Sequence, residues 1–205
     1  MRKLIISGAF ALAAALAASS AGAAVLLSDN FDTENGGAGV LNYSGFANFN
    51  VSNAGSGGAV DLIGNGFFDF YPGNGLYIDI CGSRSACGVL TTNQIFAPGT
   101  YTVTLDLAGN ARSGTSDGTT VNFGAYSNTV MLSTSQLDTL TFTTTLGSAS
   151  ALSIGDLGLL GPDVGNILLS VEVQNANNVP EPISLSLFGA GLAGLGMVRR
   201  RKRNA

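Results

Sequence analysis

The chain of 205 residues contains thirteen Asp and Glu residues and no histidine. The missing imidazole excludes Ser-His-Asp and Cys-His nucleophiles, histidine-ligated zinc or iron, and HExxH metalloproteases. The catalysis that remains is that of a carboxylate pair, as in glycoside hydrolysis. Asp69 and Asp79 are the most interesting acids because aromatic residues flank both of them. Neither lies in a distinctive motif, and an outward-facing strand position between core neighbours accounts for each, so we expect no enzyme.

A group of oxygen ligands lies near the start of the chain, where Asp29, Asn30, Asp32 and Glu34 fall close together. Carboxylate and amide oxygens suit calcium, which is the one cofactor that the sequence invites. The spacing matches neither an EF-hand loop nor an RTX repeat. Two interpretations stand, a calcium site and a solvated acidic loop.

Cys81 and Cys87 are the only cysteines of the chain. The five residues between them can close a hairpin-like loop with a disulfide between neighbouring strands. The alternatives are a metal-ligand pair and a nucleophilic thiol, and both lack the histidine that would complete a zinc site or activate the sulfur. We therefore predict a disulfide, in a chain whose ends indicate an oxidising compartment.

Tyrosines beside Gly- and Asn-rich segments could recognise sugars. Sugar sites stack pyranose rings on exposed aromatic rings and bind the hydroxyl groups with Asp, Asn and Arg side chains. The candidates, which lie close together in the sequence, are Tyr71, Tyr77, Asn74 and Arg84. We expect the neighbouring Phe67 and Phe68 in the core. The absence of tryptophan, the strongest stacking residue, counts against a sugar site.

The first residues have the three parts of a secretory signal peptide. Arg2 and Lys3 precede an apolar run from Leu4 to Ala18, and Ala21-Gly22-Ala23 supplies small residues for cleavage. We predict a signal helix over residues 1–23, removed after Ala23, and export of the chain that follows. The alternative, an N-terminal helix of the folded domain, does not explain the flanking charges and small residues.

The other end of the chain also has the features of a targeting signal. Pro180-Glu181-Pro182 leads into an apolar run, Ile183 to Val198, and five cations follow at once. The cations are Arg199, Arg200, Arg201, Lys202 and Arg203. Such an order stops a translocating chain, because the cations stay in the cytoplasm and the apolar segment lodges in the bilayer. We predict a transmembrane helix over residues 183–198.

These three parts resemble the tail of PEP-CTERM proteins of Gram-negative bacteria. The resemblance covers residues 179–205. It implies that an exosortase, an integral-membrane cysteine protease, cuts at or near residues 180–182 and passes the protein to the cell surface or the exopolysaccharide matrix. The apolar run is shorter than the roughly 20 residues that span a bilayer comfortably, which favours processing over the alternative of a permanent anchor.

The charges of the chain are divided between compartments. The exported segment, Ala24 to Pro182, holds thirteen acids and only Arg84 and Arg112 as cations, a net charge of −11. An acidic surface repels phosphate backbones and anionic lipid, so we expect no nucleic-acid partner and no peripheral membrane docking. For most of the acids, solubility of a secreted protein is sufficient explanation.

The elements that must position these residues are strands. Apolar and polar residues alternate in several runs, such as Tyr101 to Leu107 and Thr139 to Thr145, and no helical period occurs between Val25 and Asn178. A third alternating run spans residues 167–174. One of its faces is expected to hold Ile167, Leu169, Val171 and Val173.

About ten short strands separated by Gly, Pro and Asn turn clusters predict an all-β domain, an antiparallel β-sandwich or jelly roll. We place this domain at residues 24–174. Residues 175–178 have no apolar periodicity and precede a proline, so they are interpreted as a linker to the tail.

The order of the strands also resembles galactose-binding-like β-sandwiches of secreted bacterial proteins. The residues that carry this resemblance are Leu27 to Phe31, Phe96 to Asn110 and Val164 to Val171. In such domains a calcium ion often bridges the first loop and the last strand, which here would pair Asp32 or Glu34 with Glu172. The last strand often carries an acidic residue where this chain has Ser170, a departure that weakens the transferred metal site.

Two functional hypotheses follow. The first is a non-catalytic surface or exopolysaccharide-matrix protein, anchored transiently by its C-terminal helix and sorted by an exosortase. The second is a carbohydrate-binding module carried by the same route, with the exopolysaccharide as its partner. Loss of sugar binding on replacing Tyr71 and Tyr77 by alanine would favour the second.

Overall fold

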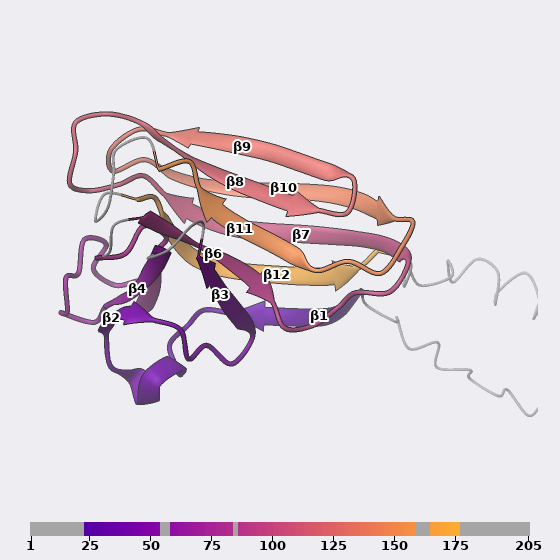
Figure 1. Cartoon of the computed structure of the whole chain (residues 1–205), viewed down its shortest axis with the longest axis horizontal. Helices are drawn as coiled ribbons and strands as arrows, with labels where there is room; N and C mark the ends of the chain where they lie inside the picture. The colour runs from indigo at the N-terminus through magenta and orange to yellow at the C-terminus, as the bar shows by residue number, and fades with distance from the viewer. Residues whose placement is uncertain (1–22, 54–57, 84–85, 159–164, 177–205) are drawn as a thin grey trace, which may run out of the picture. The chain divides into compact units, whose positions relative to one another are not determined.

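A computed structural model of the chain describes residues 23–53, 58–83, 86–158 and 165–176 (Figure 1). They belong to one compact unit, Ala23–Asn178. Several predictions fall outside the described residues, namely the signal helix before residue 23, Arg84, the end of the linker, the motif at 180–182, the transmembrane helix and the basic cluster. Among the residues that are described, none belongs to a helix long and apolar enough to span a bilayer.

The described residues form twelve strands with almost no helix, so the all-β prediction is confirmed. In chain order the elements are β1 (Ala24–Asp29), the 3₁₀ helix η1 (Glu34–Gly37), β2 (Val40–Tyr43), β3 (Phe49–Asn53), β4 (Gly58–Gly64), β5 (Leu76–Asp79), β6 (Ala86–Thr92), β7 (Gly99–Ala108), β8 (Asp117–Phe123), β9 (Tyr126–Leu132), β10 (Leu137–Leu146), β11 (Leu152–Asp156) and β12 (Ile167–Asn175). The sequence did not predict β2 and β11.

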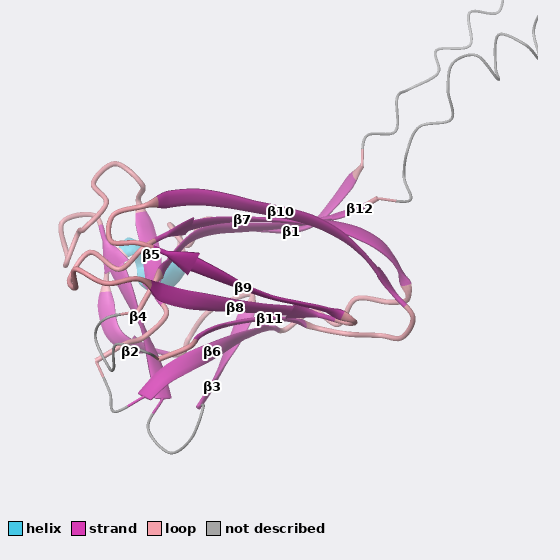
Figure 2. Ribbon diagram, turned by 90° about the horizontal axis from the view of Figure 1, so that it is seen from above, coloured by secondary structure: helices cyan, strands magenta, loops and turns pink. Residues whose placement is uncertain are grey.

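The strands lie in two facing layers (Figure 2). The layer that we call the β7 layer has the order β10-β7-β12-β5-β4, with β1 beside the second half of β12 and β2 beside β4. The second, the β8 layer, has the order β3-β6-β11-β8-β9. Pairing within each layer is antiparallel, and a short parallel pairing between β4 and β6 joins the two.

Apolar side chains between the layers form the main core. In β7, Tyr101, Val103 and Leu105 face inward and are buried, as the alternation predicts. Tyr126 of β9 stacks on Phe142 of β10 with ring centroids 3.6 Å apart. Because β9 and β10 are the end strands of the two layers, this stack nearly closes the sheet on itself.

β12 departs from the predicted alternation. Its register with β7 shifts next to Leu169, so one extra residue interrupts the pleat. Leu168 therefore joins Val171 and Val173 in the core between the layers, whereas Ile167 and Leu169 pack in a second apolar cluster on the opposite face. The prediction that Ile167 and Leu169 share a face with Val171 is wrong for this reason.

The two ends of the described unit are paired. Ala24 of β1 lies opposite Asn175 of β12, which also lies opposite Tyr101 of β7. The next residue, Ala176, donates a backbone hydrogen bond to Thr100 at 2.9 Å. The strand thus extends into the segment that the sequence assigned to the linker.

Alanine substitutions on the two sides of the bulge test its register. Leu168→Ala deletes a fully buried side chain from the core, so we expect the free energy of unfolding to fall by about 3 kcal/mol. Leu169→Ala deletes the same atoms at a half-buried position and should cost less than about half as much. Urea unfolding measures both. Equal losses would show that the pleat runs through residue 169 without a bulge.

Candidate functional site

The outer face of the β7 layer carries a polar array. Successive side chains of a strand point to opposite faces, so the polar residues between the core positions of β7 turn outward and meet those of β10. Three pairs of hydroxyl groups are hydrogen-bonded across the two strands, Thr100 with Thr145 at 3.0 Å, Thr102 with Thr143 at 3.2 Å and Thr104 with Thr141 at 3.3 Å. Such pairs stabilise the pairing of the strands and fix the orientation of the hydroxyl groups.

A cleft of about 450 Å³ lies at one end of this array. It is lined by Asn30, Asn74, Asp106, Leu107, Leu137, Asp138, Thr139, Leu169 and Ser170. Asp106 accepts a hydrogen bond from the Thr139 hydroxyl on one carboxylate oxygen and from the Ser170 hydroxyl on the other, each at 2.7 Å. Two donors hold the carboxylate in one orientation, and its remaining lone pairs can accept hydrogen bonds from a ligand.

The structure separates the predicted sugar ligands. Asn74 lines the cleft, but Tyr71 is only 9 % exposed and Tyr77 is fully buried in the second apolar cluster. The Tyr77 hydroxyl accepts hydrogen bonds from the backbone amides of Phe70 and Tyr71 and donates one to Asp69 at 3.0 Å. A stacking role for the two tyrosines is therefore wrong, because their rings support the loop that covers them.

An exposed aromatic pair lies in the same loop. Phe67 is 36 % exposed and Phe68 is 50 % exposed, and their rings meet edge to face at 4.8 Å. The expectation that both belong to the core is wrong. They follow a tight turn in which Gly64 and Phe67 exchange backbone hydrogen bonds, and Phe68 itself has a left-handed backbone with φ 45°. The Gly64-Asn65-Gly66 sequence was the available signal for this turn.

The acids predicted as calcium ligands mainly accept hydrogen bonds from backbone amides. Asp29 accepts hydrogen bonds from a backbone amide at 2.8 Å and from an Asn side chain at 2.9 Å. Asp32 accepts from the amide of Leu76 at 2.8 Å, and Glu34 accepts from a backbone amide at 2.9 Å. Glu172 lines the same small hollow as Asp29. A calcium ion between the first loop and β12 stays a prediction.

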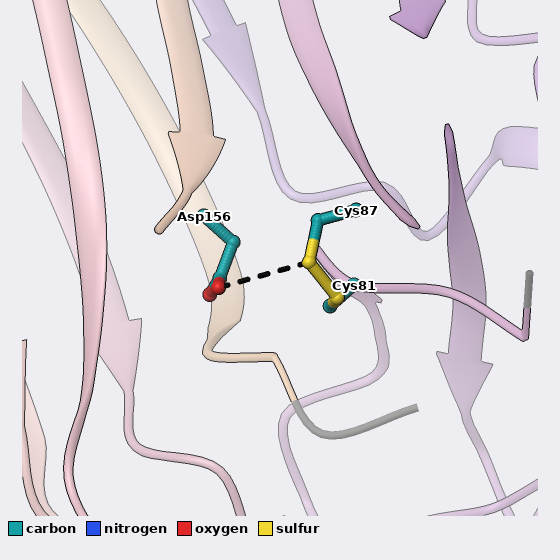
Figure 3. Close-up of side chains that lie close together, drawn as sticks. All are labelled: Cys81, Cys87 and Asp156. Carbon is teal, nitrogen blue, oxygen red and sulfur yellow. Dashed lines mark hydrogen bonds between the residues drawn. A yellow bond between two sulfur atoms is a disulfide. The ribbon is translucent and has the colours of Figure 1, made fainter. Parts of the chain in front are cut away.

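Cys81 and Cys87 form a disulfide, as predicted (Figure 3). Asp156, at the end of β11, turns its carboxylate toward the pair, with one oxygen 3.8 Å from the sulfur of Cys87. Among the described residues, these three form the one group of at least three Cys, Asp or Glu side chains whose ligand atoms all lie within 4.8 Å of one another. Thiolates are the metal-binding form of cysteine, so the bonded sulfurs offer no metal site.

A pair of buried carboxylates lies on neighbouring strands, Asp61 on β4 opposite Asp79 on β5. Asp61 accepts hydrogen bonds that tie β2 and Ser83 to the sheet. Burial raises the pKa of Asp79 to about 8, although Arg112 at 3.9 Å and the amide of Cys81 act in the opposite direction. The buried Asp79 carboxylate is thus held by an ion pair with Arg112 and by a hydrogen bond from the amide of Cys81.

Comparisons with known proteins identify the tail and the fold. The model of the PEP-CTERM protein-sorting motif matches residues 178–202, which confirms the resemblance drawn from the sequence. No curated protein matches the chain. The K3 cleaved adhesin domain of Lys-gingipain from Porphyromonas gingivalis is similar at 17% identity and a TM-score of 0.50, over 74% of this chain and 100% of that chain.

Other similar structures come from carbohydrate-active proteins. The CBM22-1 xylan-binding domain of Xyn10C from Paenibacillus barcinonensis is 11% identical with a TM-score of 0.44, over 77% of this chain and 97% of that chain. An exo-β-1,3-galactanase from Phanerochaete chrysosporium is 18% identical with a TM-score of 0.38, over 62% of this chain, which spans only 29% of that structure. The adhesin domain, at 17% identity and a TM-score of 0.50, shows similarity of fold alone.

Asp79 should make the stability of the domain depend on pH. Its pKa is about 8 in the folded state against 3.8 for an unperturbed carboxyl group, so folding favours the protonated form. The contribution of Asp79 to the free energy of unfolding is therefore full below about pH 4. It is lost as the pH rises toward about 8, by up to about 1.4 kcal/mol per pH unit.

Urea unfolding between about pH 5 and pH 8 tests this sign. Asp79→Asn should remove the corresponding part of the slope, because asparagine cannot be ionised. Asp138→Asn, at an exposed position of β10, is the matched control and should leave the slope unchanged. A slope as steep in Asp79→Asn as in the wild type would contradict the assignment.

Proposed function

We propose that this chain is a non-catalytic surface or exopolysaccharide-matrix protein, exported by a signal peptide and sorted by an exosortase through its C-terminal tail. The observation that carries the proposal is the match of the PEP-CTERM motif to residues 178–202. This motif implies secretion, a transient membrane anchor and processing by a membrane protease. In this proposal the exported part is a β-sandwich of residues 24–175.

The described domain is compatible with removal of the tail. Its last strand, β12, ends at Asn175, and the main core is built from residues between Leu27 and Val173. Cleavage at or near residues 180–182 therefore removes no strand and no core side chain of the described unit. The domain keeps all its described packing after release from the membrane.

Replacing Pro180, Glu181 and Pro182 together by alanine tests the sorting route. We expect the variant to remain in the inner membrane at precursor mass, because the protease loses its recognition motif. Immunoblots of membrane and surface fractions, with mass spectrometry of the C-terminus, measure this. Asn177→Ala, just before the matched motif, is the control and should be processed normally. Normal processing of the triple variant would refute the proposed route.

A second function, binding of a neutral polysaccharide, is favoured by the cleft around Asp106. Sugar sites combine fixed carboxylates, amides and hydroxyl groups with an apolar surface, and here Asp106, Asn30 and Asn74 lie beside Leu137, which is 61 % exposed. The exported segment has a net charge of −11, so an acidic polysaccharide would be repelled. We therefore assign the cleft to a neutral glycan chain.

Affinity electrophoresis through gels that contain the producing organism's exopolysaccharide tests the cleft. The unit of residues 23–178 should be retarded, and Asp106→Asn should bind about tenfold or more weakly, since hydrogen bonds to charged groups contribute about 1.5–3 kcal/mol. Asp69→Asn makes the same charge change outside the cleft and should behave as the wild type. Loss of retardation in Phe68→Ala but not in Asp106→Asn would move the site to the exposed aromatic pair.

A further inference from the structure

Two carboxylates meet between the layers at one end of the β8 layer. Asp117 begins β8 and Asp156 ends β11, and these strands are paired antiparallel with Asp156 opposite Thr119. Asp117 shares the inward face of β8 with Val121, and Asp156 shares that of β11 with Ile154. Both carboxylates therefore point from one layer toward the other, and Asp117 is fully buried.

The two carboxylates are near enough for the charge of Asp117 to act on Asp156. The pKa of Asp156 is raised to about 6, mainly by burial, and Asp117 acts in the same direction, whereas the backbone amides of Asn166 and Gly158 act against it. Two neighbouring carboxylates, one of them fully buried, are unfavourable when both are ionised, and a proton or a cation between them relieves the repulsion.

Two buried oxygen atoms at this site lack hydrogen-bond partners. The Oδ2 atom of Asp117 and the Oδ1 atom of Asn166 are buried and have no hydrogen-bond partner, and both residues are fully buried. Buried polar atoms are normally satisfied, so each exception requires a reason.

Two hydrogen bonds hold Asn166 next to both strands that carry the carboxylates. Its backbone amide donates to Asp156 at 3.0 Å, and its side-chain nitrogen donates to the hydroxyl of Thr119 at 3.1 Å. Thr119 is two residues from Asp117, on the same face of β8. With the nitrogen held by Thr119, the side-chain oxygen remains as an acceptor beside the two acids.

We propose that Asp117, Asp156 and Asn166 bind a calcium ion between the two layers. Two carboxylates balance a divalent charge, and a donor set of oxygen atoms only is the set that calcium prefers. Calcium also accepts irregular geometry and can complete its coordination with backbone carbonyl groups and water, whereas magnesium requires a near-ideal octahedron.

This site differs from the one that the sequence suggested. The first-loop site would join Asp29, Asp32 or Glu34 to Glu172 near the second half of β12. The new site joins β8 and β11 of one layer to Asn166, which directly precedes β12 in the other. An ion there links the layers and stabilises the folded state by mass action.

Equilibrium dialysis of the full-length chain in detergent micelles against ⁴⁵Ca²⁺ tests the proposal. We expect one ion per chain, with a dissociation constant raised about tenfold or more by Asp117→Asn and by Asn166→Ala. Glu172→Gln, which removes a carboxylate of the first-loop alternative, should bind calcium as the wild type does. Circular dichroism verifies that each variant is folded.

Thermal unfolding in a chelator supplies a second readout. Asp117→Asn removes the charge repulsion, so without calcium this variant should melt no lower than the wild type. Added calcium should raise the midpoint of the wild type and of Glu172→Gln, but not that of Asp117→Asn. Absence of calcium binding by the wild type would overturn the proposal and leave a shared proton between the acids. Loss of calcium binding in Glu172→Gln alone would also overturn the proposal and would place the ion at the first loop.

Discussion

The domain depends on β12, the strand with which the chain returns through the middle of the β7 layer. β12 pairs with β7 along its length, with β1 along its second half and with β5 at its start. The bulge at Leu169 puts Leu168 on the same face as Val171, in the main core, while Ile167 packs in the second cluster on the other face. Because the first and last strands are neighbours, the β7 layer is completed only when the whole domain is present.

The acids are used in three different ways. Asp29, Glu34 and Asp61 are buried and hold backbone amides, so they organise loops rather than charge the surface. Asp106 is fixed by two hydroxyl groups on the outer face, where a ligand can reach it. Asp117 lies between the layers. The surface is therefore less acidic than the net charge of the exported segment indicates, and its exposed carboxylates have specific positions.

Alternation was a sufficient guide for long strands such as β7 and β10, and it failed where strands are short or irregular. β2 contains Asn42 in a left-handed conformation, and β11 is only five residues long with Gly155 inside it. The cleft could not be predicted because Asp106 and Ser170 meet only through the pairing of β7 with β12, a contact between distant segments. Tyr77 was misplaced because no local pattern shows that a loop folds over it.

The pairing of β12 has a mechanical consequence. A pull on the chain beyond Ala176 enters the domain along the axis of β12, which is held by β7 on one side and by β1 on the other. Hydrogen bonds of antiparallel strands lie perpendicular to the strand axis, so such a force loads many of them together in shear rather than opening them one by one. A domain tethered through this strand would resist flow and traction at a cell surface far better than one tethered through an end strand.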